Sequence, residues 1–264
     1  MRKLPMTGPK IGLIDIETAP LNADVWALFD QNVGLNQINV EWSILSFCFK
    51  ELHAPKRDVL YMDTQGNPRD DSGLLPVLWQ IMHEFDFLIA QNGKRFDMRK
   101  IRARLILNGF EPPSPVKVMD TMLMARKAAA FTSNKLEWLS TYLSSVQKSK
   151  HKDFPGHELW AECLKDNPKA WASMRRYNIP DVLSMEQVYL NLRPWASEHN
   201  IAAYTDHEDM VCPICLSHDL TQDGHYFTGV SQYNRYRCNG CGAWSRDRFT
   251  INSRDKRKSL LVGV

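Results

Sequence analysis

Two acidic residues interrupt an apolar stretch near the start of the chain, in the run Ile-Gly-Leu-Ile-Asp-Ile-Glu-Thr. The β-branched residues predict a strand over residues 10 to 17. Side chains alternate faces along a strand, so Asp15 and Glu17 point to one side while the intervening isoleucines point to the other. Two carboxylates there are costly to desolvate unless a cation or hydrogen-bond donors compensate. A strand end at which both acids meet water is the alternative.

The segments that follow predict an α/β fold. The sequence predicts strands at 42 to 49 and 57 to 62, a helix at about 72 to 84, a strand at 86 to 91, a helix at 97 to 108 and a strand at 116 to 120. From residue 121 to about 193 the pattern is helical and includes a long helix from near Pro168 to Leu192. Three antiparallel strands followed by alternating helices and strands indicate a mixed sheet flanked by helices.

A second acidic residue of interest follows the strand at 86 to 91. Asp97 ends the run Gln-Asn-Gly-Lys-Arg-Phe-Asp and opens the next helix, where ordinary helix capping is the alternative to a functional role. Asn92 either contacts a substrate or holds the turn. Lys94 and Arg95 place positive charge beside the acid, which suits a phosphate backbone, although a solvated helix face also explains such charges.

A tyrosine and an aspartate share one face of the long late helix. Tyr177 and Asp181 are four residues apart, so they point in the same direction if the helix is continuous. Pro180 lies between them, lacks a backbone donor and predicts a kink. Asp120, at the end of the strand at 116 to 120, is interpreted as structural. Five tryptophans are interpreted as core residues: Trp42, Trp79, Trp138, Trp160 and Trp171.

Taken together, the three acidic stretches resemble the DEDD superfamily of 3′-5′ exonucleases. The motifs of that family match, in order along the chain, Asp15, Glu17, Asp97, Tyr177 and Asp181. The third motif is of the Tyr-x-x-x-Asp type, and Arg176 stands where a histidine-type motif has His, so the tyrosine branch (DEDDy) is favoured. The resemblance covers about residues 10 to 193 and is greatest to the YprB-type predicted exonucleases common in phages.

The resemblance implies a ribonuclease-H-like fold and a metal-dependent 3′-5′ exonuclease that cuts DNA, with single-stranded 3′ ends as the expected substrate. Oxygen ligands without His or Cys favour two Mg²⁺ or Mn²⁺ ions. Asp15 is assigned to both ions, Glu17 and Asp181 to the ion holding the attacking water, and Asp97 to the ion of the leaving group. Tyr177 would orient the water. The alternatives are the same catalysis on RNA, or a non-catalytic zinc-ribbon adaptor for nucleic acids.

Four of the six cysteines form two Cys-x-x-Cys pairs, which are Cys212 with Cys215 and Cys238 with Cys241. This spacing predicts a zinc ribbon with one structural Zn²⁺ and a hairpin between the pairs, at about 226 to 236. Disulfide pairing is the alternative. The predicted domains are an exonuclease domain over 1–204 and a zinc ribbon with a basic tail over 205–264. So small a module needs a bound metal or a cross-link to stabilise its fold, and the four cysteines supply it.

The net charge of +3 does not by itself indicate a nucleic-acid partner. The ribbon, however, mixes cations with aromatic residues, a composition suited to single strands, while docking to a replication or recombination protein is the alternative. The apolar run after the basic N-terminus is too short for a signal peptide or a membrane span. We therefore expect a cytoplasmic protein, in the host cytoplasm if the chain is phage-encoded, that binds DNA rather than RNA and no membrane.

Overall fold

The computed structural model describes residues 8–146, 153–196, 198–206 and 208–262. The chain divides into two compact units, of which one spans Lys10–Tyr189 and the other contains the chain from Leu190 onward. All four paired cysteines belong to the second unit. The domain boundary that the sequence predicts near residue 204 stays a prediction. Within the described part of the chain, no helix combines the length and the apolar composition that crossing a membrane requires.

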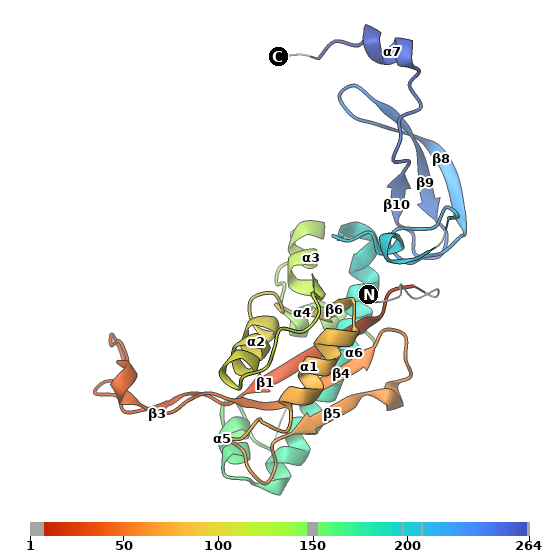
Figure 1. The fold of residues 1–264 in the computed structure, drawn as a ribbon. Helices are drawn as coiled ribbons and strands as arrows, with labels where there is room; N and C mark the ends of the chain where they lie inside the picture. Colours follow the sequence, from red (N-terminus) through yellow and green to blue (C-terminus); the bar gives the residue numbers. More distant parts are fainter. Residues whose placement is uncertain (1–7, 147–152, 197, 207, 263–264) are drawn as a thin grey trace. The chain divides into compact units, whose positions relative to one another are not determined.

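A five-stranded mixed sheet forms the centre of the first unit, in the order β5-β4-β1-β6-β7 (Figure 1). Its strands are β1 (Ile11–Thr18), β4 (Ile44–Glu51), β5 (Leu60–Asp63), β6 (Phe87–Ala90) and β7 (Lys117–Asp120). β1 pairs antiparallel with β4 and parallel with β6, so the strand that carries the first two acids is the central one. The predicted mixed sheet is confirmed.

Helices cover both faces of this sheet. The helices are α1 (Leu75–Glu84), α2 (Asp97–Leu107), α3 (Thr121–Ala128), α4 (Leu136–Leu143), α5 (Glu158–Leu164) and α6 (Pro168–Ala196). α1 and α2 pack on the face of Ile14, Ile16 and Phe47, where they complete one apolar core. α6 continues through Pro180 without ending there, so the residues from Tyr177 to Asp181 occupy successive turns of one helix.

A buried ion pair joins α6 to the opposite face of the sheet. Lys50, in β4, is fully buried, and its Nζ lies 3.0 Å from Oε1 of Glu186. The same ammonium group donates to the carbonyl oxygens of Glu51 and Ala54. A buried charge is tolerated when it is paired and hydrogen-bonded in this way. The pair therefore fixes which face of α6 meets the sheet.

The tryptophans are less buried than the sequence suggests. Trp171 is fully buried, as predicted. Trp42 and Trp79 are partly buried against the core beneath α1 and α2, and Trp160 is partly buried against the core around α6. The ring of Trp138 contacts those of Phe131 and Tyr142 in tilted arrangements. The indole of Trp160 has a further contact, described with the site below.

A two-stranded arm that the sequence does not predict interrupts the chain between β1 and β4. Its strands are the short β2 (Asn22–Ala23) and β3 (Ile38–Val40), with the 3-10 turn η1 (Leu35–Gln37) before β3. The arm extends away from the sheet (Figure 1). Its apolar side chains reach solvent, with exposed fractions of 96% for Trp26, 88% for Leu28 and 87% for Leu35.

The second unit contains a small three-stranded sheet in the order β10-β9-β8. Its strands are β8 (Leu220–Phe227), β9 (Gln232–Cys238) and β10 (Trp244–Arg246), and the hairpin predicted between residues 226 and 236 is confirmed. Three further short elements complete the described chain: the 3-10 turns η2 (Lys56–Asp58) and η3 (Ile201–Tyr204), and helix α7 (Arg254–Ser259) in the basic tail.

Candidate functional site

Three carboxylates from two elements converge beside the central strand. Asp15 and Glu17 lie on the same face of β1, and Asp181 meets them from α6, with one carboxylate oxygen from each residue within 4.8 Å of the others. Like charges this close oppose ionisation of the group. A divalent cation with a preference for oxygen ligands removes that cost, and the donor set fits such an ion. The expected convergence of these three residues is therefore observed.

Asn178 holds one of these carboxylates in place, although the sequence analysis does not single it out. Its side-chain N–H donates to Oδ2 of Asp15 at 2.8 Å, and its own carbonyl oxygen accepts from the hydroxyl of Ser46 at 2.8 Å. Both Asn178 and Ser46 are fully buried. Ser46 stands opposite Glu17 in the pairing of β1 with β4. The amide therefore links α6, β4 and the first carboxylate.

Trp160 positions the second carboxylate. Its indole N–H donates to Oε2 of Glu17 at 3.2 Å, and its ring meets the ring of Tyr177 edge-on with centroids 6.0 Å apart. Trp160 belongs to α5, so a helix that contributes no carboxylate supports both an acid and the tyrosine. The indole is partly buried rather than a core residue, and it has a polar role at the site that the sequence does not reveal.

Asp97 lies beside this cluster and is bound to the backbone of β1. β6 pairs with β1 only as far as Leu13, and beyond that point Oδ1 of Asp97 accepts from the N–H of Ile16 at 3.2 Å. The side chain is buried at the first position of α2. Burial raises the pKa of Asp97 to about 7. Backbone hydrogen bonds lower this pKa, and the charge of Asp120 raises it further. Asp97 is therefore a carboxyl group that a nearby cation would help to ionise.

Asp120 organises the turn that leads into Asp97. Its carboxylate accepts from the backbone N–H groups of Asn92 and Lys94, both at 3.1 Å, and also caps α3. Asn92 has a left-handed backbone with φ of 60°, and a Cβ at Gly93 would lie 2.3 Å from Cβ of Ala90. The turn therefore requires glycine and a buried acceptor. These contacts support the structural interpretation of Asp120.

A cavity of about 380 Å³ contains the four carboxylates and the tyrosine. Its lining is Asp15, Ile16, Glu17, Gln91, Asn92, Phe96, Asp97, Met122, Lys135, Leu136, Glu137, Tyr177 and Asp181. Asn92 reaches the cavity, whereas Lys94 and Arg95 are exposed on the same turn outside its lining. Phe96, Lys135 and Glu137 line it without any sequence motif that indicates such a position.

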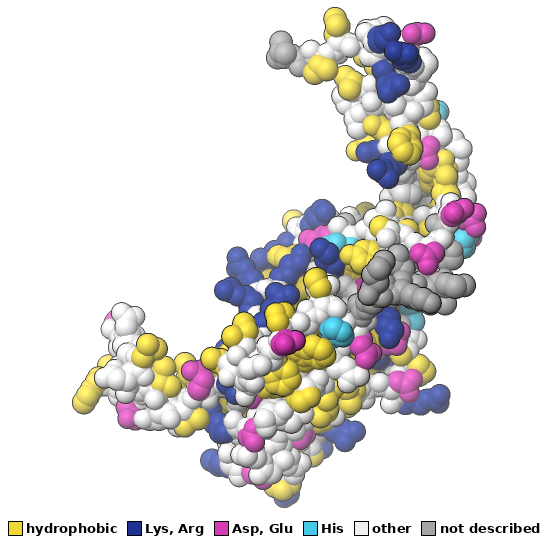
Figure 2. Space-filling view, viewed as in Figure 1, with side chains coloured by type: hydrophobic (Ala, Val, Ile, Leu, Met, Phe, Trp, Pro, Cys, Tyr) yellow, Lys and Arg dark blue, Asp and Glu magenta, His cyan; other side chains and the backbone are white. Residues whose placement is uncertain are grey.

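Basic side chains gather outside this cavity. Figure 2 shows Lys and Arg over α2 and α3, the region that includes Arg95, Arg99 and Arg102. Not all cations of this region are available to a ligand, because Arg104 forms a buried pair with Asp71 at 2.7 Å and Lys100 lies 3.6 Å from the ring centroid of Trp42. The remaining exposed cations suit a polyanion.

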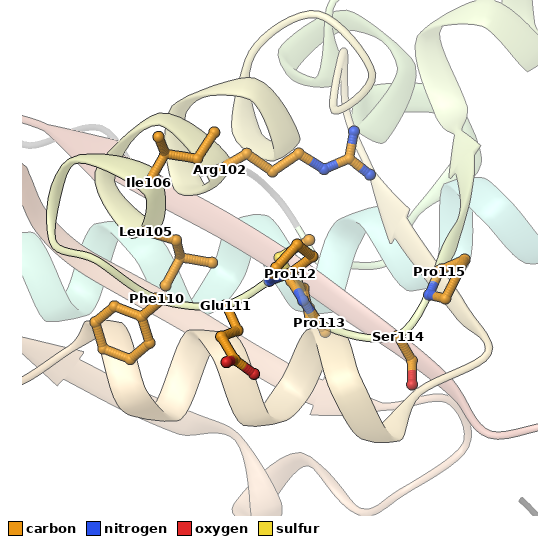
Figure 3. Close-up of a pocket in the computed structure, with 10 residues that line it drawn as sticks. Arg102, Leu105, Ile106, Phe110, Glu111, Pro112, Pro113, Ser114 and Pro115 are labelled. Atoms are coloured by element: carbon orange, nitrogen blue, oxygen red, sulfur yellow. The ribbon is translucent and has the colours of Figure 1, made fainter. Parts of the chain in front are cut away.

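A second cavity, of about 280 Å³, has a different character. It lies between α2 and the proline-rich segment that follows Phe110 (Figure 3). Its apolar lining includes Leu105, Ile106 and Phe110. Arg102 and Glu111 also line it. The lining contains none of the clustered carboxylates, so the chemistry of the site belongs to the first cavity.

The four paired cysteines form a separate candidate metal site. Sγ of Cys212 lies 3.7 Å from Sγ of Cys241, and Sγ of Cys215 lies 3.6 Å from Sγ of Cys238. A disulfide would require about 2.05 Å, whereas thiolates at about 2.3 Å from one tetrahedral Zn²⁺ are spaced by a little under 4 Å. Burial raises the pKa of Cys215 to about 11, so a cation would favour its thiolate form. Burial also acts to raise the pKa of Cys238, but hydrogen bonds from the backbone N–H of Cys241 and from the Cys215 thiol outweigh it and lower that pKa to about 7. The cluster fits a zinc ribbon.

Known proteins that this chain resembles include a solved structure and a protein family. A family B DNA polymerase of solved structure, from the hyperthermophilic archaeon Pyrobaculum calidifontis, is similar with a TM-score of 0.49 and 12% identity, over 71% of this chain and 25% of that chain. This chain thus spans about a quarter of the polymerase. A search of curated proteins gave no match. The sequence model of the RNase H superfamily matches residues 34–193, which is more than half of the 264 residues. The chain belongs to the RNase H superfamily.

Proposed function

We propose that this protein is a metal-dependent 3′-5′ exonuclease of the tyrosine branch of the DEDD superfamily, similar to the YprB-type enzymes, that hydrolyses DNA from single-stranded 3′ ends. One observation carries the proposal. The carboxylates of Asp15, Glu17 and Asp181 converge within 4.8 Å in a cavity that also holds Asp97 and Tyr177. Membership of the RNase H superfamily supports a nuclease that uses divalent metals.

The residues fit two hard cations. Asp15 would bind both ions, with Glu17 and Asp181 on one and Asp97 on the other. Two bound Mg²⁺ or Mn²⁺ ions would supply an activated water and a charge partner for the leaving 3′ oxygen. The chain itself holds the ligands in place, through Asn178 on Asp15 and Trp160 on Glu17.

Tyr177 is proposed to orient the attacking water. Its ring is fixed against Trp160, and the residue lines the cavity one helical turn before Asp181. A phenol with an ordinary pKa of about 10 is a weak general base at neutral pH, so a hydrogen bond to the water is the contribution we assign to it. Asn92 is proposed to contact the substrate strand inside the cavity, and Lys94 and Arg95 to contact phosphates further out.

The test uses strands labelled at either end. Purified protein is incubated with 5′-labelled and 3′-labelled DNA and RNA, with Mg²⁺, Mn²⁺ or EDTA. A 3′-5′ exonuclease yields a ladder from the 5′ label and mononucleotide from the 3′ label, and EDTA stops both. Asp15→Ala and Asp181→Ala should abolish cleavage with the fold retained, and Tyr177→Phe should leave residual activity. Glu111→Gln, which changes an exposed acid of the second cavity, is the matched control.

Each alternative predicts a distinct result. Degradation of RNA with intact DNA supports the exoribonuclease, which has the same catalytic groups. Binding without cleavage under any metal supports the non-catalytic adaptor. Full metal-dependent activity in Asp15→Ala would contradict the assignment of the site.

A further inference from the structure

One face of the small sheet in the second unit collects aromatic and arginine side chains. The strand register places Tyr226 opposite Tyr233, Trp244 opposite Arg237 and Arg246 opposite Arg235. Residues directly opposite in antiparallel strands share a face, and so do residues two apart along one strand. All six side chains therefore lie on the same side of β8, β9 and β10. We call them the arginine-aromatic face.

These side chains stack on one another. The guanidinium of Arg246 lies 4.0 Å from the ring centroid of Tyr233 and 5.4 Å from that of Tyr226. The guanidinium of Arg235 lies 4.5 Å from the ring centroid of Trp244. The rings are still open to solvent, with exposed fractions of 47% for Tyr226 and 48% for Trp244. Tyr226 and Trp244 thus each contact a cation and leave about half of their surface exposed to a ligand, while Tyr233 is partly exposed.

The opposite side of the sheet has a different composition. By the same register, the paired residues on that side include aromatic rings but no arginine: Gln222, His225, Phe227, Gln232, Asn234, Tyr236 and Ser245. The carboxylate of Asp247 is directed to that side as well, because it accepts from the side-chain amide of Asn234 at 2.8 Å. On the arginine-aromatic face, Asp223 approaches Arg235 at 3.7 Å. Arg237 and Arg246 add further positive charge, so this face is cationic and its reverse is not. Figure 2 shows Lys and Arg beside apolar side chains on this sheet.

We propose that the arginine-aromatic face binds single-stranded nucleic acid. Unpaired bases offer flat surfaces that stack on tyrosine, tryptophan and arginine planes, and arginines also neutralise the phosphates between those bases. A duplex hides its base surfaces and would use only the charges. A protein partner would need acidic groups for Arg235, Arg237 and Arg246 but would have no need for stacking planes.

This binding site extends the proposed function to the choice of substrate. The preference for a nucleic acid rests in part on that function, because a nuclease needs a means of holding its strand. Binding and cutting are nevertheless separate properties of the chain. The face would bind a strand even if the carboxylate site proved inactive, so the two proposals are tested by different measurements.

The experiment measures binding in the full chain with cleavage blocked. The Asp15→Asn variant, loaded with zinc and without added Mg²⁺, is titrated into a fluorescent oligothymidylate of about 15 nucleotides, a duplex of equal length and an abasic strand of equal length. Anisotropy gives each Kd. We expect the single strand to bind more tightly than the duplex and the abasic strand. We expect Tyr233→Ala, Trp244→Ala and Arg246→Gln each to weaken binding about 5- to 100-fold.

Matched controls come from the reverse of the sheet. Gln222→Ala and Ser245→Ala, combined with Asp15→Asn, should bind the strand as the parent does. Zinc content is measured for every variant, which shows whether the ribbon is folded. Trp244→Phe keeps a stacking plane, so this variant should retain most of the affinity for the strand that Trp244→Ala loses. These two readouts separate a lost contact from a ribbon that fails to fold.

Three results would overturn the proposal. The first is unchanged affinity in the three face variants while they hold zinc. The second is equal affinity for the abasic strand, which would remove stacking from the interaction. The third is a combination of two observations: polyglutamate displaces the strand, and the protein binds single strands and duplex equally well. This result would indicate an acidic protein partner. The nuclease assay on the unmodified chain is read independently, so its failure does not affect this outcome.

Discussion

The side-chain amide of Asn178 lies 2.8 Å from Oδ2 of Asp15, and it does so across 163 positions of sequence. The contact joins the central strand to the long helix at the point where the carboxylates meet. It also fixes the orientation of an acid that we propose as a ligand of two cations, since partners behind a metal ligand set its direction.

Replacing Asn178 with alanine should weaken metal binding more than it weakens the fold. The variant would lack the donor that Asn178 gives to Asp15 and the acceptor that it gives to Ser46, and such losses typically reduce metal affinity by about 10- to 100-fold. The Mg²⁺ concentration needed for half-maximal nuclease activity is the measurement. Ser184→Ala serves as control, because Ser184 is also buried on α6 but donates only to the carbonyl of Asp181 among the contacts described. An unchanged Mg²⁺ requirement in the Asn178 variant would contradict the positioning role.

Trp160→Phe should reduce activity with little change in packing. The phenyl ring retains apolar contact with Tyr177 but cannot donate to Glu17. The loss of one hydrogen bond to a charged group corresponds to about 1.5–3 kcal/mol. If all of this free energy is lost from metal binding, the metal affinity falls by roughly 10- to 150-fold. Trp79→Phe removes an equivalent indole bond, to the carbonyl of Glu111, far from the carboxylates. Equal effects of the two variants on the Mg²⁺ requirement would show that the indole bond to Glu17 has no special role.

Without divalent metal, Asp97 should make the fold less stable as the pH rises. Burial raises its pKa to about 7 in the folded state, from an ordinary value of 3.8. Between these values the folded state holds the additional proton, so the free energy of unfolding falls as pH rises from about 4 to about 7 and then levels off. Asp97→Asn removes this dependence. In urea unfolding from pH 5 to 8, the free energy of unfolding of Asp97→Asn should rise relative to that of the parent as the pH increases. For the control Asp30→Asn, on the arm, the difference from the parent should stay constant.

The cysteine cluster should hold about one equivalent of zinc. Cys238→Ser should lose the metal and expose the segment from β8 to β10 to protease, because a structural zinc supplies much of the folding free energy of so small a module. Metal analysis and limited proteolysis are the measurements. Cys163→Ala, at a buried cysteine outside the cluster, should keep its zinc. Zinc retained in Cys238→Ser would contradict the four-cysteine assignment.

Much of the fold follows from local pattern. The apolar alternation in β1 predicts both the strand and the common face of Asp15 and Glu17, and helical spacing predicts that Tyr177 and Asp181 point together. The cysteine spacing predicts the hairpin between the pairs. These predictions succeed because period and spacing act within one element, where geometry is fixed by the backbone.

The remaining features depend on contacts between elements. Asn178 and Trp160 have no motif, and only the packing of α6 and α5 against the sheet brings them to Asp15 and Glu17. The arm is missed because β2 and β3 have two and three residues, too few for a periodic signal.

The arm separates the halves of the carboxylate cluster along the chain. Asp15 and Glu17 precede it, and Asp181 follows it together with the neighbouring Asp97, while its exposed tip offers a protease an accessible backbone. A single cut there would leave β1 held between β4 and β6 by its two rows of backbone hydrogen bonds. The cluster would then be shared by two polypeptides in one folded body. The central strand would then belong to a separate peptide, so a peptide that contains β1 is a candidate to restore activity to a chain that lacks this strand.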